Sequence, residues 1–393
     1  MTPAPPRRER RYELDALRVL AVLALLLYHA SRPFDTEVWH LKNLEKSAGL
    51  ELFGNLLTPW RLPLLFMISG LGTYYALGFR SAWRYARERL GRLLLPLAFG
   101  MAVVVVPQVY VERISVGMPD RMSPRDFHGS YLDFYPHYFE GAYPSGNLSW
   151  HHLWFLSYLL VFSLAALPLF LYLRGKRGRH QATRMASWLR PGRRIFLLAL
   201  PLAVIHVALR GRFPSTHALV GDWWNLAHYF LLFLLGYVLL PQPAFKEGAE
   251  ANRRLGAALF VIAFVMRLAL VPLLAPIAPY SLAYAALLTL RAVIEWSALI
   301  AVIGYAGVYL NRPSRVLRYG GDRVYPFYIW HQTVIVVVAY FVLGWTAGPI
   351  VKFAAISVIS LAVTVALCEA VGMTVVTRRL FGMKTGDEGR AAG

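Results

Sequence analysis

Long runs of apolar residues divide the chain into ten segments that could each cross a lipid bilayer. They cover residues 13–31, 56–79, 93–112, 152–173, 195–209, 223–240, 255–273, 284–310, 325–344 and 350–376. The fifth segment is short for a complete crossing, and no internal repeat of fixed period is visible. Because backbone polar groups inside a bilayer must pair within the chain, such runs predict helices. We therefore expect an all-α polytopic membrane protein with about ten transmembrane helices.

Basic residues predict how these helices are oriented. With the N-terminus in the cytoplasm, 28 of the 41 lysine and arginine residues fall in the inner segments and nine fall outside or at outer helix ends. Cytoplasmic loops carry an excess of Lys and Arg, so both termini are expected to be cytoplasmic. The predicted organisation is a cytoplasmic basic N-terminus at 1–12, a single transmembrane domain at 13–376 and a cytoplasmic tail at 377–393.

Composition supports residence in the bilayer. Hydrophobic residues make up 57% of the chain and charged residues 16%, whereas soluble domains usually carry about a quarter charged residues. We expect a multi-pass membrane protein. The inner loops and contact with anionic lipid account for most of the net charge of +20, so no nucleic-acid partner is needed. The single cysteine, Cys368, excludes a cysteine metal cluster, and the adjacent His151 and His152 lack ligand spacing, so no metal is expected.

The first apolar segment contains the ionisable residues Asp15, Arg18 and His29. Arg18 and His29 are eleven residues apart, so a helix brings them to within ~20° of one face and separates them by ~16 Å along its axis. Asp15 lies three residues before Arg18, close enough to be its ion partner. Such groups are costly in a span unless they face protein or a watery cavity. We interpret this face as half of an active site; an interfacial histidine and a snorkelling arginine are the alternative.

The two long outer connections, residues 32–55 and 113–151, combine acidic residues with many aromatic ones. Such a surface can stack on sugar rings and hydrogen-bond to their hydroxyls. The same composition also fits an interfacial aromatic belt. The sequence leaves both interpretations open. The inner segment 174–194 is strongly basic and is expected to be a solvated linker.

Several short motifs resemble membrane acyltransferase family 3, whose members O-acylate extracytoplasmic glycans. The family has a basic residue, ten intervening residues and a histidine in its first helix, which Arg18 and His29 match. It also has an Arg-x-x-Arg motif before its third helix, which Arg89 and Arg92 match. The blocks RLPLLFMISG, HLWFL and YPFYIWHQ and the late Glu369 are similar to further family features, in the same order. VWHL, RERLG and HLWFL are most similar to the branch that succinylates periplasmic glucans.

This resemblance implies that the donor is an acyl-coenzyme A held from the cytoplasm and that the acceptor is a sugar hydroxyl outside. The donor is a co-substrate, and no permanently bound cofactor is expected. Arg89 and Arg92 would clamp its phosphates, with Arg18 and His331 along its passage. His29 would then be the general base that deprotonates the acceptor. A transient acyl-histidine is the rival mechanism.

Four residues are candidates for the donor that stabilises the tetrahedral oxyanion, and the sequence does not choose among them. They are Arg61, His152, Trp154 and Tyr328. Arg61, His152 and Trp154 are also expected on the acceptor side. His331 is six residues into the ninth segment from its inner end, so we expect it closer in depth to Arg18 than to His29. For both His152 and His331, a structural role is the alternative.

Other polar or small residues in the spans have simpler interpretations. Arg291 and Glu295 are four residues apart, so they can pair with each other as a structural brace. Glu369 is expected to pair with an arginine of a neighbouring helix. Gly70 fits close packing of helices.

The main alternative function is a polytopic transporter or flippase for a glycan or another anionic substrate, which would use the same intramembrane charges. Such proteins commonly show two related halves, and no such symmetry is visible in this chain. A non-catalytic scaffold of a glycan-synthesis complex is a third possibility. The sequence does not indicate an oligomeric state.

Overall fold

The computed structural model describes residues 11–115, 122 and 125–383, and these residues form helices joined by loops, without a named β-strand. Seven helical stretches are long and apolar enough to cross a membrane. They are Tyr12–Phe34, Ala48–Phe79, Ala82–Ile114, Pro243–Leu274, Leu282–Tyr309, Arg315–Val342 and Pro349–Gly372. The all-α, multi-pass character predicted from the apolar runs is therefore confirmed for the described part of the chain.

The predicted number of ten spans is not confirmed, because three of the predicted segments are short or broken. Within the described residues, His151–Ala165 and Leu167–Leu173 join at a bend of 54°, and Lys176–Leu189 and Arg194–Leu209 at a bend of 119°. If each bent pair is counted as one span, the described residues contain nine candidate spans. Helix α11, Trp223–Leu239, has only 17 residues, fewer than the roughly 20 that a perpendicular crossing needs.

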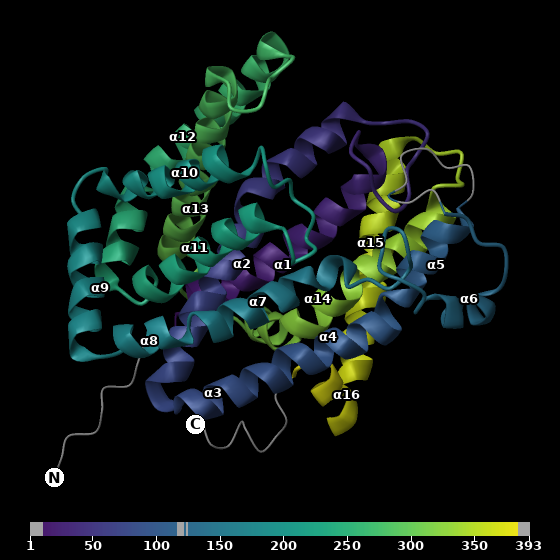
Figure 1. Ribbon diagram of the computed structural model, residues 1–393, viewed down its shortest axis with the longest axis horizontal. Helices are drawn as coiled ribbons and strands as arrows, with labels where there is room; N and C mark the ends of the chain where they lie inside the picture. The colour runs from purple at the N-terminus through teal and green to yellow at the C-terminus, as the bar shows by residue number, and fades with distance from the viewer. Residues whose placement is uncertain (1–10, 116–121, 123–124, 384–393) are drawn as a thin grey trace.

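A central group of helices holds the core together. Helix α1 (Tyr12–Ser31) packs against α2 (Ala48–Phe79) and α14 (Arg315–Val342), and α14 also packs against α15 (Pro349–Gly372). In Figure 1 these helices cross the middle of the molecule. Elements from both ends of the chain thus meet in one hydrophobic core.

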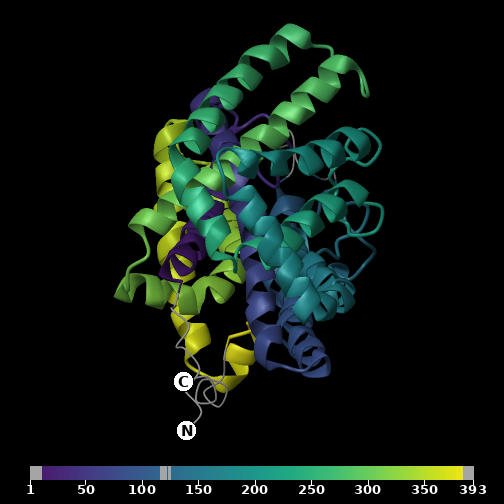
Figure 2. The same cartoon turned by 90° about the vertical axis from the view of Figure 1, so that its left-hand side faces the viewer.

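The remaining helices surround this group. Their bounds are α3 Ala82–Arg89, α4 Leu95–Phe99, α5 Val106–Ile114, α6 Tyr131–His137, α7 Trp154–Ala165, α8 Leu167–Leu173, α9 Lys176–Leu189, α10 Ala199–Leu209, α12 Pro243–Leu274, α13 Leu282–Tyr309 and α16 Val375–Leu380. Helices α12 and α13 pack along each other as a hairpin whose tip projects beyond the rest of the molecule, as Figures 1 and 2 show.

The stretch Ala82–Ile114 is continuous but irregular. Two π-helical turns, Leu90–Leu94 and Gly100–Val104, separate α3, α4 and α5. Pro96 and Pro107 follow these turns closely, and a proline cannot donate the hydrogen bond of a regular turn. The wider turns change the direction in which neighbouring side chains point, and Arg92 lies in the first of them.

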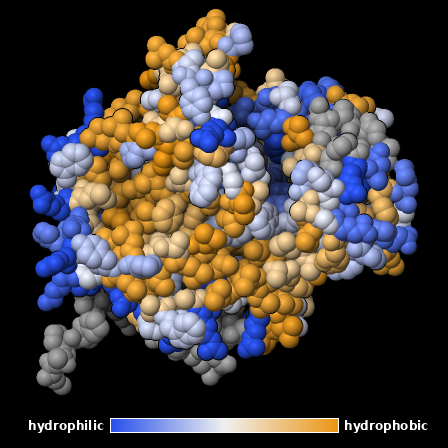
Figure 3. All heavy atoms as spheres, viewed as in Figure 1, coloured by the Kyte–Doolittle hydropathy of each residue, from blue (hydrophilic) through white to orange (hydrophobic). Residues whose placement is uncertain are grey.

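The basic segment 174–194 differs from its prediction. It forms α9 rather than an unstructured linker, although Lys and Arg residues still dominate it. Figure 3 shows hydrophilic residues along the edge where α9 lies and hydrophobic residues over most of the central face. Of the two predicted terminal segments, residues 1–10 and 384–393 lie outside the described residues, so the side on which the termini lie stays a prediction.

Two glycines let helices α2 and α11 approach each other closely. A Cβ atom at Gly70 would lie 2.1 Å from the carbonyl oxygen of Phe233, and one at Gly236 would lie 2.0 Å from that of Met67. Both distances are well inside van der Waals contact, so the two backbones touch. The predicted packing role of Gly70 is confirmed, and it follows the small-residue rule for membrane helices.

Replacing Gly70 by alanine is expected to lower the free energy of unfolding by about 1–3 kcal/mol, because the methyl group forces the two backbones apart. Gly72→Ala is the matched control, since a Cβ atom there meets nothing within 4 Å and both changes raise helix propensity equally. Thermal unfolding in detergent measures the difference. Equal stability of the two variants would contradict the close contact.

Candidate active site

Three histidines from three helices meet in the interior. The ring centroid of His331 (α14) lies 5.3 Å from that of His29 (α1) and 5.3 Å from that of His152, which lies just before α7. The expectation that His331 lies at the depth of Arg18 is therefore wrong. Helix α14 begins at Arg315, ten residues before the apolar segment, so the inner end of the apolar run was not the end of the helix.

The hydrogen bonds of these histidines differ. The Nδ1 atom of His331 lies 2.7 Å from the carbonyl oxygen of Tyr328. A carbonyl only accepts, so Nδ1 carries the proton and the Nε2 atom of the neutral ring keeps its lone pair. This Nε2 atom, like Nδ1 of His29, is buried without a hydrogen-bond partner. Two histidines thus offer unused ring nitrogens next to each other.

His152, in contrast, has partners at both nitrogens. Its Nε2 atom donates to the carbonyl oxygen of Ile329 at 2.9 Å, and its Nδ1 atom accepts from the amide of Gln108 at 3.3 Å. The ring is neutral and fixed in place, so it can orient its neighbours but has no free lone pair with which to take a proton. The arrangement favours the structural alternative for His152.

Arg61 brings a positive charge to the same place. It lies on α2, is 3% exposed, and its guanidinium carbon is 3.4 Å from the ring centroid of Tyr28, the residue before His29. Its charge acts on both His29 and His331, and its Nε atom has no hydrogen-bond partner. Arg61 is thus a cation with a spare donor beside two imidazoles.

The other two oxyanion candidates are committed elsewhere. The hydroxyl of Tyr328 donates to the carbonyl oxygen of His152. Trp154 stacks on His217, with ring centroids 4.2 Å apart, and among the described residues it makes no ring contact with His29 or His331. Of the four candidates, Arg61 keeps a buried donor without a partner.

The segment between α1 and α2 lies against His29. The ring of Trp39 stacks near His29 with a centroid distance of 6.4 Å. Buried Lys42 holds the segment in shape by donating to the carbonyl oxygen of Arg32 at 2.6 Å and to the carboxylate of Asp35 at 2.7 Å. Lys352 of α15 ties it from the other side through the side chain of Asn43, at 3.0 Å.

A buried hydrogen-bond network extends from His152 to His40 and Glu112. Gln108 contacts His152 and, at 3.1 Å, Gln332, whose amide reaches Nε2 of His40 at 3.2 Å. The Nδ1 atom of His40 lies 2.6 Å from Glu112. The sequence analysis missed this network because its members are distant in the chain. Polar residues inside apolar helices were the available signal.

The two predicted donor-binding arginines lie on the first irregular span. Arg89 donates to Thr73 at 3.3 Å and packs over Tyr85, and Arg92 donates to the carbonyl oxygen of Gly382 at 3.4 Å. Both are half-buried. Neighbouring Glu88 lies 3.5 Å from Arg92. The guanidinium groups lie at a helix surface, and their phosphate-binding role stays a prediction.

The predicted pairing of Arg18 with Asp15 is confirmed, at 3.6 Å. The Arg18 side chain is 36% exposed and lies about three turns from His29 along α1. Glu369 pairs with Arg323 of α14, at 2.9 Å, as predicted. The predicted pair of Arg291 with Glu295 does not form.

Comparison with known proteins decides the family. The model of an acyltransferase domain, acyltransferase 3, matches residues 11–369 of this chain. The chain belongs to acyltransferase family 3. It is also 26% identical, over 281 residues and 67% of either chain, to glucans biosynthesis protein C of Salmonella paratyphi B. It is 25% identical to the protein of the same name from Escherichia coli K12, over 62% of this chain and 60% of that one.

Two groups of residues in the acyltransferase have the composition of metal ligands. One is His40, Glu112 and His151; the other is His206, His228 and Glu295. In the first group Nδ1 of His40 donates to the carboxylate while Nε2 accepts from Gln332. In the second group the indole of Trp224, which can only donate, points at Nδ1 of His206 at 2.9 Å, so Nε2 of that ring carries the proton.

The rings of His40 and His206 therefore do not direct a lone pair at the other members of their groups. Glu295 accepts instead from Nε2 of His228 at 2.7 Å, which explains why it does not pair with Arg291. Both groups are explained as hydrogen-bond networks, and the expectation of no metal site stays a prediction.

The loop between α10 and α11 contains a histidine that the sequence analysis missed. His217 stacks on Trp154, and its backbone N–H donates to Asp222 at 2.8 Å. Asp222 also accepts from Asn225 at 2.9 Å. Burial lowers the pKa of His217 to about 4. Its positive φ of 55° marks a tightly constrained turn in the acyltransferase.

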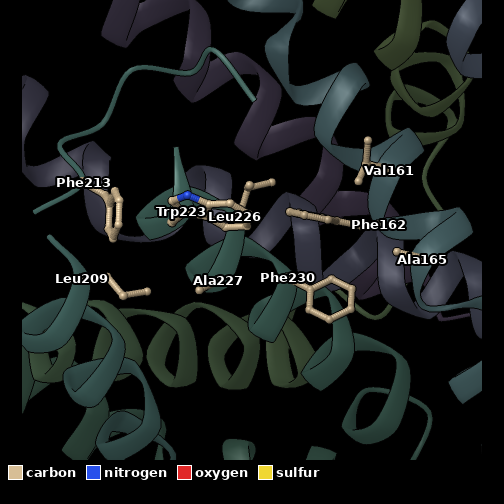
Figure 4. Close-up of a pocket in the computed structure, with 9 residues that line it drawn as sticks. All are labelled: Val161, Phe162, Ala165, Leu209, Phe213, Trp223, Leu226, Ala227 and Phe230. Atoms are coloured by element: carbon tan, nitrogen blue, oxygen red, sulfur yellow. The ribbon is translucent and has the colours of Figure 1, made fainter. Parts of the chain in front are cut away.

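The acyltransferase also has an apolar groove between α7, α10 and α11, away from the three histidines. Figure 4 shows its lining of Val161, Phe162, Ala165, Leu209, Phe213, Trp223, Leu226, Ala227 and Phe230. The lining offers neither a carboxylate nor a basic group. The groove therefore fits an apolar occupant, and none of the predicted site residues lines it.

Acidification is expected to destabilise the acyltransferase through His217. The unfolded ring titrates near pH 6.5 and the buried ring near 4, so between these values the unfolded state binds more protons. The free energy of unfolding then falls by at most about 1.4 kcal/mol per pH unit across this window. His217→Gln should remove this part of the pH dependence, measured by thermal unfolding from pH 7 to pH 4. His128→Gln, at an exposed histidine, is the control; identical slopes in the two variants would contradict the assignment.

Proposed function

We propose that this protein is an O-acyltransferase of the bacterial inner membrane that moves an acyl group from cytoplasmic acyl-coenzyme A to a hydroxyl of a periplasmic or cell-surface glycan. The observation that carries the proposal is the meeting of His29 and His331, with unused ring nitrogens, beside the buried Arg61. A base and a cation in one place are what acyl transfer to an alcohol requires. The family match supports the reaction class.

In the proposed reaction, His29 removes the proton of the acceptor hydroxyl as its oxygen attacks the thioester carbonyl. The carbonyl oxygen becomes an oxyanion, and Arg61 donates to it. When the tetrahedral intermediate collapses, the C–S bond breaks, an ester remains on the sugar, and the coenzyme leaves as a thiolate that takes the proton from His29. His331 lies beside His29 and orients the reacting groups. Transfer through an acyl-histidine is the rival route.

The donor is proposed to enter from the side of Arg89 and Arg92. Two guanidinium groups three residues apart can bind the coenzyme phosphates in bidentate fashion. Arg18, ~16 Å from His29 along α1, would lie on the way from these arginines to the histidines. The acyl arm would run along this line, so that the thioester reaches the level of His29 while the nucleotide stays at the inner surface.

The acceptor is proposed to be a glucan, because the relatives from Salmonella and Escherichia coli are glucans biosynthesis proteins. The aromatic outer segments that cover His29 supply surfaces on which sugar rings can stack. Succinyl is the first choice for the acyl group and acetyl the second. The basic residues along the proposed path suit the free carboxylate of a succinyl group as well as the phosphates of the coenzyme.

His29→Ala is expected to lower acyl transfer by about 100- to 10,000-fold, because a positioned general base contributes that much. Mass spectrometry of glycans after incubation of purified protein with succinyl-coenzyme A and glucan measures the transfer. His128→Ala, at an exposed loop histidine, is the matched control. Undiminished acylation by the His29 variant would contradict the assignment. Glucan uptake into vesicles without acylation by the wild type would instead support a transporter.

Replacing both Arg89 and Arg92 by glutamine is expected to raise KM for acyl-coenzyme A at least about tenfold and to leave kcat within about twofold, because binding and not chemistry is weakened. Arg84→Gln with Arg87→Gln is the matched control, since these exposed arginines lie on the same helix. Steady-state kinetics separates the two constants. A lower kcat with an unchanged KM would contradict the phosphate clamp.

A further inference from the structure

Three arginines from different elements gather near the outer ends of α10, α12 and α13. They are Arg210, which follows α10, Arg267 of α12 and Arg291 of α13. The guanidinium carbons of Arg210 and Arg291 lie 4.3 Å and 5.6 Å from the ring centroid of Trp224. The charge of Arg291 also acts repulsively on Arg210 and on Arg267. We call these three residues the arginine cluster.

The arginine cluster has no internal counter-charge. Within the described residues, none of its members forms an ion pair with a carboxylate, and the nearby Glu295 is bound to His228. The Nη1 atom of Arg210 and the Nε atom of Arg291 are buried without a hydrogen-bond partner. Cations that gather in a membrane protein without a counter-charge are costly, so this arrangement calls for a compensating anion.

A hydroxyl adds to the donors at this place. The Oη atom of Tyr284, on α13, is buried and also lacks a partner. A Cβ atom at Gly211 would lie 3.0 Å from it, so Tyr284 sits directly against the residue after Arg210. The charges of Arg291 and Arg267 and the hydroxyl of Tyr284 all act on Arg210, so guanidinium groups and a hydroxyl lie close together. Such a set of donors matches the several acceptor oxygens of a phosphate group.

The position of the arginine cluster points to a lipid. Arg267 lies between Met266 and Leu268, which are 44% and 46% exposed on the apolar surface of α12. Arg267 is seven residues from the end of α12 and Arg291 nine from the start of α13, so both lie roughly 10–14 Å from the tip of the hairpin. The apolar groove starts at Leu209 and Trp223, the chain neighbours of Arg210 and Trp224.

We propose that the arginine cluster, with Tyr284, binds the phosphate of an anionic phospholipid in the outer leaflet. The phosphate lies among the guanidinium groups, and the acyl chains lie along the exposed apolar face of α12. This binding site is separate from the acyl-transfer site, because no member of the cluster contacts the three histidines. It adds a specific lipid requirement to the protein.

The test is retention of phosphatidylglycerol by the full-length protein. Protein from vesicles of phosphatidylcholine with phosphatidylglycerol is extracted, and bound lipid is counted by native mass spectrometry. Arg267→Gln combined with Arg291→Gln is expected to weaken phosphatidylglycerol binding by at least about tenfold, because charged hydrogen bonds are lost. Arg212→Gln is the control: it removes one positive charge at an exposed residue two positions after Arg210.

The outcomes are distinct. Unchanged retention in the double variant overturns the proposal. Millimolar inorganic phosphate is also added to the lipid-bound protein. If it displaces phosphatidylglycerol and binds as tightly as the lipid does, the natural ligand is a soluble phosphate, and the lipid assignment is overturned. The variant with lysine at both positions keeps the charge and should retain part of the binding, which separates lost binding from misfolding. The experiment measures bound lipid and not glycan acylation. A failure of the lipid proposal therefore leaves the proposed acyl transfer untouched, and a failure of acyl transfer leaves the lipid proposal untouched.

Discussion

A polar group that leaves water for the interior of a helical bundle must find its partner inside the bundle, and most features of this protein follow from that constraint. Glu369 finds Arg323, Glu295 finds His228, and His152 uses both of its nitrogens. Other buried groups do not find a partner. The unused ring nitrogens of His29 and His331 and the Nε atom of Arg61 come together from three helices, and a second set lies in the arginine cluster. Buried polar groups without a partner are exceptions that call for an explanation.

The sequence predicted features that depend on neighbours along the chain. Apolar runs located the helices, three-residue spacing predicted the pair of Asp15 and Arg18, and the small size of Gly70 indicated close packing. It did not identify which residue of another helix serves as a partner: it predicted an arginine for Glu369 without naming Arg323, and it missed the partner of Glu295. The four-residue spacing of Arg291 and Glu295 favoured a brace, but His228 of a different helix took the carboxylate instead.

The apolar runs also did not predict how far a residue lies from the start of its helix. The ten residues before Tyr325 carry several charges and are still helical. Counted from Arg315, His331 therefore lies ~24 Å into the helix, whereas a count from Tyr325 gives only ~9 Å. His217 was missed for another reason. It lies in a loop, and only the folded chain places its ring on Trp154.

The cover over His29 has a kinetic consequence. Lys42 is almost fully buried and holds the segment that carries Trp39, while Lys352 fastens the same segment to α15. In the proposed reaction, a sugar that reaches His29 past Trp39 displaces this segment, which breaks the contacts of both lysines. Such rearrangements of loops take microseconds or longer. In that reaction, the rate at which the segment opens would set an upper limit on turnover, and the contacts of Lys42 and Lys352 would influence that rate without touching the reacting groups.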